Sequence, residues 1–383
     1  MSSLKRHLVN PSEPLRTVDA NKELLASLDR IVIYSPPVHT CSTGWVFQGF
    51  YSGPTSTAYL FYRLSRIFPS LEFKQQSLFD WAESYLELGS NVQNKAPDPN
   101  HCGIANETLA HLSLSAVMKQ DENLARQVCS FEPAVNTKTE EGSNEWLYGR
   151  AGYLYCLRLC RTVFKDSASK TSSTASMLDN TIATTVARIL SASQPWTWHE
   201  KSYFGAVHGA VGIITQLVLS QPSVAPAVQP LLSHLLDQQL ESGNFPSSAG
   251  SESDRLVQFC HGGPGFNVSL RSLAPYFPGL KGRIEDAMRR ADTDIWRRGV
   301  LTKTPCLSHG VAGNALALLG GDQRLKHFLS FMSTVSMEEV GWLDEIKKGD
   351  GFAGLYTGEA GRAWVWGVVA AGEDRVLLGY NDL

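Results

Sequence analysis

One kind of turn, a glycine in a run of small residues, returns seven times along this chain of 383 residues. Between successive turns the chain advances by 50, 46, 60, 53, 48 and 48 residues, counted between the first glycines: Gly53, Gly103, Gly149, Gly209, Gly262, Gly310 and Gly358. Glycine at such positions permits positive φ and close approach of the backbone. A period of this size is typical of a structural repeat, in which each unit buries its apolar face against its neighbours. The pattern therefore predicts an array of seven similar units.

Each turn is followed by a short apolar segment and then by a longer amphipathic one. The segments 153–159 and 213–219 are apolar nearly all round, which predicts helices that are buried on most sides. The segments 177–190, 228–236 and about 280–298 carry apolar residues at helical spacing instead. Each repeat is thus expected to contain one inner and one outer helix. The N-terminal segment from Leu15 to Leu28 supplies the first outer partner.

The ends of the array indicate that it closes into a ring. An open solenoid needs polar capping repeats, yet the last inner segment, 363–371, is as apolar as the others. We therefore predict an all-α fold, a single α/α toroid over residues 1–383 with seven inner and seven outer helices. The glycine turns then meet at one mouth of the ring, at the N-termini of the inner helices. Stretches 91–100 and 166–176 are predicted surface loops.

The composition excludes several classes of protein. A net charge of −3 gives no reason to expect nucleic acid or an anionic membrane surface as a partner. No run approaches the ~20 apolar residues of a membrane span, and the polar start does not resemble a signal peptide. Seven scattered cysteines then indicate free thiols in a reducing compartment. We therefore expect a cytoplasmic protein.

Cysteine and histidine gather at the later turns. Cys260 and His261 precede Gly262, while Cys306 and His309 precede Gly310. Zinc binds thiolate and imidazole ligands, and a catalytic zinc keeps three protein ligands and one open position. These turns are therefore candidates for a metal site. The alternative is that the cysteines are small buried apolar residues, which is common for free cysteine.

Four further residues are candidates for catalysis or substrate binding. His208 precedes Gly209 and is either a satisfied buried histidine or a general acid and base. Lys303 lies close to His309 in the sequence and either binds a substrate carboxylate or is a solvated loop residue. Tyr148 and Arg150 flank Gly149. For Arg150 the alternative is an ion pair with Glu145 or with a neighbouring helix end.

The order of the turns resembles that of the lanthionine synthetase C-like (LanC-like) proteins over nearly the whole chain. The resemblance is carried by Tyr148-Gly149-Arg150-Ala151-Gly152, by Val207-His208-Gly209 and by the run 259–265. It implies an α/α toroid that binds one zinc ion at its mouth and adds a thiol to a dehydroamino acid. In bacterial members this reaction closes thioether rings in secondary metabolism, and in eukaryotic members the thiol is glutathione.

The resemblance also implies individual roles. Cys260 matches the first zinc cysteine, His309 the zinc histidine, His208 the residue that protonates the enolate, and Lys303 a lysine directed towards glutathione. We also take His261 and Arg150 as candidate catalytic residues, and Tyr148 with Arg150 and Lys303 as candidate substrate-binding residues. The expected partner is a small molecule or peptide, glutathione included.

One departure from the family pattern bears on the metal. Ser308 stands where the family has a zinc cysteine, and a serine hydroxyl is a poor zinc ligand beside a thiolate. Either Cys306 replaces the missing ligand, or the site is reduced to Cys260 and His309 with His261 as a further candidate, or it is empty.

Two alternative functions follow from that departure. The first is a metal-free enzyme that converts a small metabolite, with His208 or His261 as acid and base. The second is a non-catalytic protein that binds glutathione or another ligand. A glycosidase ranks last, because it needs two carboxylates at its site and the turns offer only Glu359.

Overall fold

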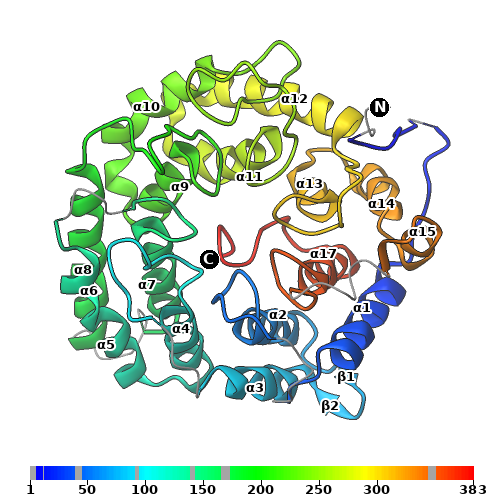
Figure 1. Cartoon of the computed structure of the whole chain (residues 1–383), viewed down its shortest axis with the longest axis horizontal. Helices are drawn as coiled ribbons and strands as arrows, with labels where there is room; N and C mark the ends of the chain where they lie inside the picture. Colours follow the sequence, from blue (N-terminus) through cyan, green and yellow to red (C-terminus); the bar gives the residue numbers. More distant parts are fainter. Residues whose placement is uncertain are drawn as a thin grey trace.

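The structure, a computed structural model, describes residues 6–11, 13–38, 45–90, 95–138, 143–164, 173–343 and 351–383. In these residues the helices form two concentric layers around one centre (Figure 1). Residues 91–94 and 166–172 of the two predicted surface loops lie outside the described residues. Of the described parts, 95–100 is irregular, as a loop should be. The prediction was wrong for 173–176, which is the first turn of the helix Ser173–Leu190.

The inner layer is made of the apolar segments that follow the turns. Its helices are α2 (Pro54–Ile67), α4 (Glu107–Lys119), α7 (Arg150–Phe164), α9 (Ala210–Ser220), α11 (Gly263–Leu273), α13 (Val311–Ala317) and α17 (Glu359–Ala371). Each packs against the next along the chain, and α17 packs against α2. The ring is therefore closed, as the apolar last segment predicts.

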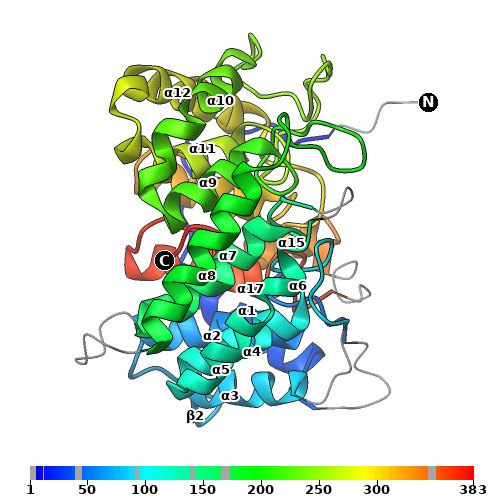
Figure 2. The ribbon, with the colours of Figure 1, turned by 90° about the vertical axis from the view of Figure 1, so that its left-hand side faces the viewer.

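The outer layer follows the same order. Its helices are α1 (Ala20–Tyr34), α3 (Leu78–Gly89), α5 (Glu122–Ser130), α8 (Ser173–Leu190), α10 (Ala225–Asp237), α12 (Lys281–Arg298) and α14 (Asp322–Ser330). Each packs on the inner helix that precedes it, except that α1 packs on α17. Figure 2 shows this wall from the side, with α8 in front of α7. The N-terminal segment thus forms an outer helix, as predicted. This helix begins at Ala20, after the N-cap residue Asp19, and so starts later than the predicted Leu15.

Shorter elements connect the layers. They are α6 (Glu132–Val135), α15 (Thr334–Glu339) and the 3-10 turns η1 (Pro222–Val224), η2 (Ala274–Tyr276) and η3 (Pro278–Leu280). The two-residue strands β1 (Glu72–Phe73) and β2 (Gln76–Ser77) form an antiparallel hairpin between α2 and α3. No described helix is long and apolar enough to span a membrane.

Main-chain hydrogen bonds tie neighbouring turns into a rim. They run from Phe50 to Ile104 (2.9 Å), Cys102 to Tyr148 (2.7 Å), Trp146 to Val207 (3.1 Å), Cys260 to Ser308 (3.0 Å), Ser308 to Tyr356 (3.0 Å) and Tyr356 to Tyr51 (2.9 Å), each from N–H to carbonyl oxygen. Between the fourth and fifth turns, Gly205 lies so close that a Cβ there would come within 2.3 Å of the Cys260 carbonyl oxygen. Glycine is needed because the backbones touch.

The turns stand at the N-termini of the inner helices, with one displacement. Gly53, Gly209, Gly262, Gly310 and Gly358 are N-cap residues. In the second repeat the N-cap is Asn106, three residues after Gly103, because its side-chain oxygen accepts the N–H of Leu109 at 3.0 Å. An asparagine side chain satisfies a helix start more completely than glycine.

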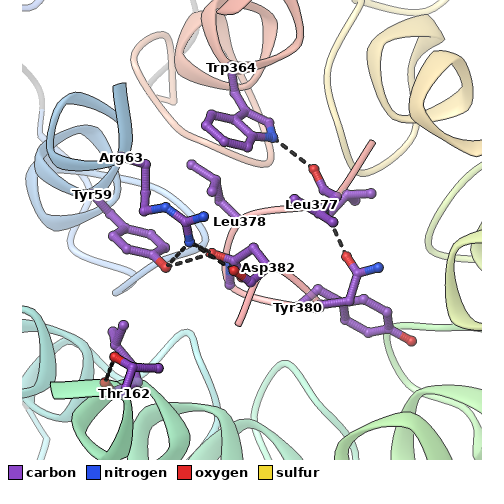
Figure 3. A network of polar contacts seen from close by, with 12 residues as sticks. Tyr59, Arg63, Thr162, Trp364, Leu377, Leu378, Tyr380 and Asp382 are labelled. Atoms are coloured by element: carbon purple, nitrogen blue, oxygen red, sulfur yellow. Dashed lines mark hydrogen bonds and ion pairs between the residues drawn. The ribbon is translucent and has the colours of Figure 1, made fainter. Parts of the chain in front are cut away.

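The C-terminal segment fills the centre of the ring (Figure 1). The side chain of Asp382 is buried between Arg63, with which it forms an ion pair, and Tyr59, whose hydroxyl donates to it at 2.6 Å (Figure 3). Its neighbour Tyr380 packs edge-on against Trp146 at 5.4 Å between ring centroids. The C-terminal segment therefore packs against the third turn, to which Trp146 belongs.

Candidate functional site

A histidine and a carboxylate from neighbouring turns meet at the mouth. Nδ1 of His208 lies 3.2 Å from a carboxylate oxygen of Glu145. The Glu145 carboxylate is itself fixed, because it accepts the main-chain N–H groups of Leu147 and Tyr148, both at 2.6 Å, and its side chain is 1% exposed. The carboxylate directs the proton of the neutral imidazole to Nδ1, which leaves the lone pair on Nε2, so this atom is able to accept a proton.

Aromatic rings surround His208. The indole of Trp198 is stacked on the imidazole with 3.9 Å between ring centroids and 5° between the planes. Tyr148 and Tyr203 lie at 6.2 and 6.3 Å, and His261 at 6.2 Å. The predicted residues Tyr148, His208 and His261 are therefore brought together.

Cys260 lies at the end of a chain of polar contacts. Its sulfur accepts a hydrogen bond from the side-chain amide of Gln258 at 3.0 Å, and the amide oxygen of Gln258 accepts one from Lys303 at 3.3 Å. Burial raises the pKa of the Cys260 thiol, and hydrogen bonds from Gln258 and Ser308 together with the charge of Lys303 lower it. The structure thus links Lys303 to Cys260 through Gln258.

Ser308 occupies the position beside this sulfur. Its hydroxyl is hydrogen-bonded to Cys260 and accepts a hydrogen bond from the hydroxyl of Tyr51 at 3.2 Å. Burial raises the pKa of Tyr51, so its hydroxyl stays a donor at neutral pH. A neutral pair of hydroxyl groups therefore faces Cys260 where the family pattern has a thiolate.

Cys306 caps its own turn. The side chain is fully buried, and its sulfur accepts hydrogen bonds from the main-chain N–H groups of His309 and Ser308. Burial raises the pKa of this thiol to about 11. Glu145 has the same arrangement, four residues before Gly149 as Cys306 is four residues before Gly310. The repeat therefore gives Cys306 the place of a capping residue.

The donor atoms at the mouth do not fit a zinc site with three protein ligands. Within the described residues, no group of three or more His, Cys, Asp or Glu side chains is arranged to hold a metal ion. Cys260 and His309 are the ligands that the resemblance predicts, but the hydroxyl of Ser308 lies beside Cys260 in place of a third one, and the sulfur of Cys306 is turned into its own loop. Zinc stays a prediction from the resemblance, and no catalytic step is assigned to it.

The two other histidines differ from His208 in their surroundings. Burial lowers the pKa of His261 to about 4, with the charges of His208 and Lys303 acting in the same direction. Its Nδ1 atom is buried and has no hydrogen-bond partner in the part of the chain that the structure describes. Burial, followed by the charge of Lys303, also lowers the pKa of His309. Both imidazoles are therefore neutral at pH 7.

Arg150 lies beneath the mouth and is fully buried. Its guanidinium donates to the carbonyl oxygens of Val135, Ser143 and Thr137 and to the side-chain oxygen of Asn144, at 3.0 to 3.2 Å. These bonds hold the loop that leads into the third turn. The contacts support a structural role for Arg150, and its catalytic and substrate-binding roles stay predictions.

Sequence reasoning missed several residues of the site. From the sequence, Glu145 is expected only as a partner of Arg150, and Trp198, Tyr51 and Gln258 are not marked as site residues. A signal was available for Glu145, since it stands at the same distance before its glycine as Cys306 and Gln258 do before theirs. Nothing local marks Trp198, which lies ten residues before His208.

Comparison with known proteins agrees with this architecture. LANCL1 of Danio rerio, named a glutathione S-transferase, is 29% identical over 283 residues, which cover 70% of this chain and 68% of the relative. LanC-like protein GCL1 of Arabidopsis thaliana is 29% identical over 271 residues, which cover 63% of this chain and 59% of that protein. The solved structure of nisin cyclase superimposes with a TM-score of 0.60 at 12% identity, over 94% of this chain and 95% of that one.

The structural match confirms the predicted α/α toroid, and at this identity it speaks for the fold alone. A sequence model of the family described as lanthionine synthetase C-like protein matches residues 44–374. The chain belongs to the lanthionine synthetase C-like family.

Proposed function

We propose that the protein catalyses the conjugate addition of a thiol, glutathione in the first instance, to an α,β-unsaturated acceptor of the dehydroamino acid type. The observation that carries the proposal is the hydrogen bond between His208 and Glu145 at the mouth of the ring. Membership of the family and the glutathione in the name of the LANCL1 relative support the choice of thiol.

His208 can serve both proton transfers of this reaction. Its Nε2 atom takes the proton of the thiol, and the thiolate forms a bond to the β-carbon of the acceptor. The π electrons of the double bond move towards the acceptor carbonyl, which gives an enolate. The same Nε2 atom then returns the proton to the α-carbon. One S–H bond and one π bond break, one S–C and one C–H bond form, and no oxidant is needed.

Glu145 assists while the proton is held on His208. Its carboxylate faces Nδ1 and stabilises the imidazolium between the two transfers. Proton transfer by a positioned side chain contributes typically about 10²–10⁴-fold to a rate. We assign the carboxylates of glutathione to Lys303, and the planar acceptor to the face of Tyr148, which is 37% exposed.

The proposal also places the protein in the cytoplasm. The six cysteines in the described residues are all free, which agrees with a reducing compartment that contains glutathione. The partners we propose are accordingly the thiol and a small-molecule or peptide acceptor.

A second candidate is a glutathione-binding protein without catalytic activity. The observation that favours it is the hydroxyl of Ser308 beside Cys260, which takes the place of a metal-binding thiolate. In that case Lys303 still binds the carboxylate, but the thiol is not activated.

Incubation with glutathione and N-acetyldehydroalanine methyl ester separates the two candidates. We expect thioether formation above the uncatalysed rate that saturates with glutathione. His208→Gln should abolish the enzymatic part, while the control His234→Gln, an exposed histidine on α10, should keep it. A rate equal to the uncatalysed one, with glutathione binding seen by calorimetry, would establish the second candidate instead.

A further inference from the structure

A short hairpin at the mouth, which we call the Trp198 hairpin (residues 196–203), carries the indole that covers His208. Trp198 and Lys201 exchange main-chain hydrogen bonds at 3.0 and 3.1 Å. The base is anchored twice, because Tyr203 pairs with Ser248 and the indole N–H of the buried Trp196 donates to the carbonyl oxygen of Ile189 at 3.3 Å. The tip therefore projects from a fixed base.

The tip of this hairpin is strained. His199 and Glu200 have φ values of 45° and 62°, in the left-handed region. A two-residue loop of this kind is normally made with asparagine and glycine, which tolerate positive φ. Both residues are exposed, so burial of their side chains does not explain the conformation. Strain that persists at a potential reaction centre points to something that the loop positions.

The loop positions Trp198 on the imidazole of His208. The rings are parallel within 5° at 3.9 Å, and Tyr148 is nearly parallel to both, at 6.3 Å from Trp198 and 6.2 Å from His208. Glu145 fixes the Nδ1 edge of the same imidazole. One edge and one face are thus occupied, and the side chain of His208 is 14% exposed.

We infer that Trp198 is a positioning residue for His208, holding the imidazole in the plane in which Nδ1 faces Glu145 and Nε2 faces the substrate. This inference rests on the proposed function. The stacked indole prevents the imidazole from turning about its Cβ–Cγ bond, which would replace Nδ1 by a carbon atom opposite Glu145 and carry Nε2 away from the substrate. It also excludes water from one face, so that the proton taken from the thiol returns to the α-carbon and not to solvent. Misplacement of a reacting group by about 1 Å can cost about 10²-fold in rate.

Two substitutions separate stacking from simple burial. Trp198→Leu keeps an apolar side chain but removes the planar ring, whereas Trp198→Phe keeps a ring. We expect Trp198→Leu to lower kcat for glutathione and N-acetyldehydroalanine methyl ester about 10- to 100-fold with KM changed less than about threefold. Trp198→Phe should restore most of kcat. The control Trp81→Phe alters a buried tryptophan on α3, outside the Trp198 hairpin, and should change stability more than kcat.

A measurement that does not need turnover tests the same inference. In protein labelled with ¹⁵N-histidine, the signals of His208 are identified by their loss in His208→Gln. We expect a single tautomer with the proton on Nδ1 in the wild type and in Trp198→Phe, and averaging between tautomers in Trp198→Leu. An unchanged tautomer in a folded Trp198→Leu protein overturns the inference, whether or not the wild type is active. Absence of turnover in the wild type, with the tautomer lost in Trp198→Leu, supports the inference and refutes the proposed reaction.

Discussion

Glu145 and His208 are 63 residues apart in the sequence, yet a carboxylate oxygen of the first lies 3.2 Å from Nδ1 of the second. They belong to the third and fourth turns, which are joined by the hydrogen bond from the N–H of Trp146 to the carbonyl oxygen of Val207. The acid-base pair is therefore made by the contact between two repeats. Neither repeat contains it alone.

Glu145→Gln should lower the rate of thiol addition by about 10² or more, because an amide cannot stabilise the imidazolium of His208 as a carboxylate does. The variant keeps the size of the side chain and one acceptor for the main-chain N–H groups, so we expect it to fold. Steady-state kinetics with Glu285→Gln, an exposed glutamate on α12, as control would measure the effect. A rate equal to that of the control would refute the assignment.

Ser308→Cys should create zinc affinity. The substitution adds a thiolate beside Cys260 and His309, which gives the three protein ligands that a catalytic zinc requires. We expect weak or no binding in the wild type and tighter binding in the variant. That affinity should rise with pH, because thiols must lose their protons to bind. Competition with a chromogenic chelator would measure it.

Two results with the wild-type protein would contradict the expectation of weak zinc binding. Tight, stoichiometric zinc that survives Cys306→Ala would show that Ser308 does not weaken the site. Tight zinc that is lost in Cys306→Ala would make Cys306 the third ligand, although its sulfur accepts hydrogen bonds from main-chain N–H groups in this structure.

Gly209→Val should unfold or strongly destabilise the protein. A Cβ at Gly209 would lie 2.3 Å from the backbone nitrogen of Gly205, within the rim. Overpacking against backbone costs at least about 2 kcal/mol of the free energy of unfolding. Gly282→Val is the matched control, since nothing lies within 4 Å of the Cβ that it would add. Equal melting temperatures of the two variants would contradict the close approach.

Glu107 should make stability depend on pH. Burial raises the pKa of this carboxyl group from 4.5 to about 7, although Thr55 and the N–H of Gly49 donate hydrogen bonds to it and lower it. Since the folded pKa lies above the unfolded one, the stability that this group contributes is complete below pH 4.5 and is lost as the pH rises through 7.

Compared with Glu107→Gln, the wild type should therefore lose about 3 kcal/mol of unfolding free energy between pH 4.5 and 7. Urea unfolding of both proteins across this range would measure the difference. Parallel curves would mean that the carboxyl group titrates alike in both states.

The fold was predictable because it depends on local patterns that repeat. The glycine spacing and the apolar inner segments determine a closed ring, and only details escaped, such as the start of α4 at Asn106. The C-terminal segment could not be foreseen. Its buried residues, Asp382 among them, show no helical or strand period, and their partners Arg63 and Tyr59 are more than 300 residues earlier.

The site was predictable only in part. The residues directly before the glycines, Tyr148, His208, His261 and His309, are marked by the repeat itself. Glu145 and Trp198 act through contacts that exist only when turns and hairpin are assembled. The spacing before Gly149 marks the position of Glu145 but not its contact with His208, and nothing near Trp198 in the sequence marks that residue. For Cys306 the sequence leaves a metal ligand and a small buried apolar residue as alternatives. The hydrogen bonds from main-chain N–H groups to its sulfur are a third arrangement that the sequence does not predict, and its role as a ligand stays a prediction.

The configuration at the α-carbon of the product tests the central claim most directly. Uncatalysed addition of glutathione to N-acetyldehydroalanine methyl ester protonates the α-carbon from either face and gives a mixture of both configurations. If Nε2 of His208 delivers the proton, the enzymatic product has one configuration, and His208→Gln returns the mixture. Analysis of the product by chiral chromatography would show this. A mixture of both configurations from an active wild-type protein would contradict the account.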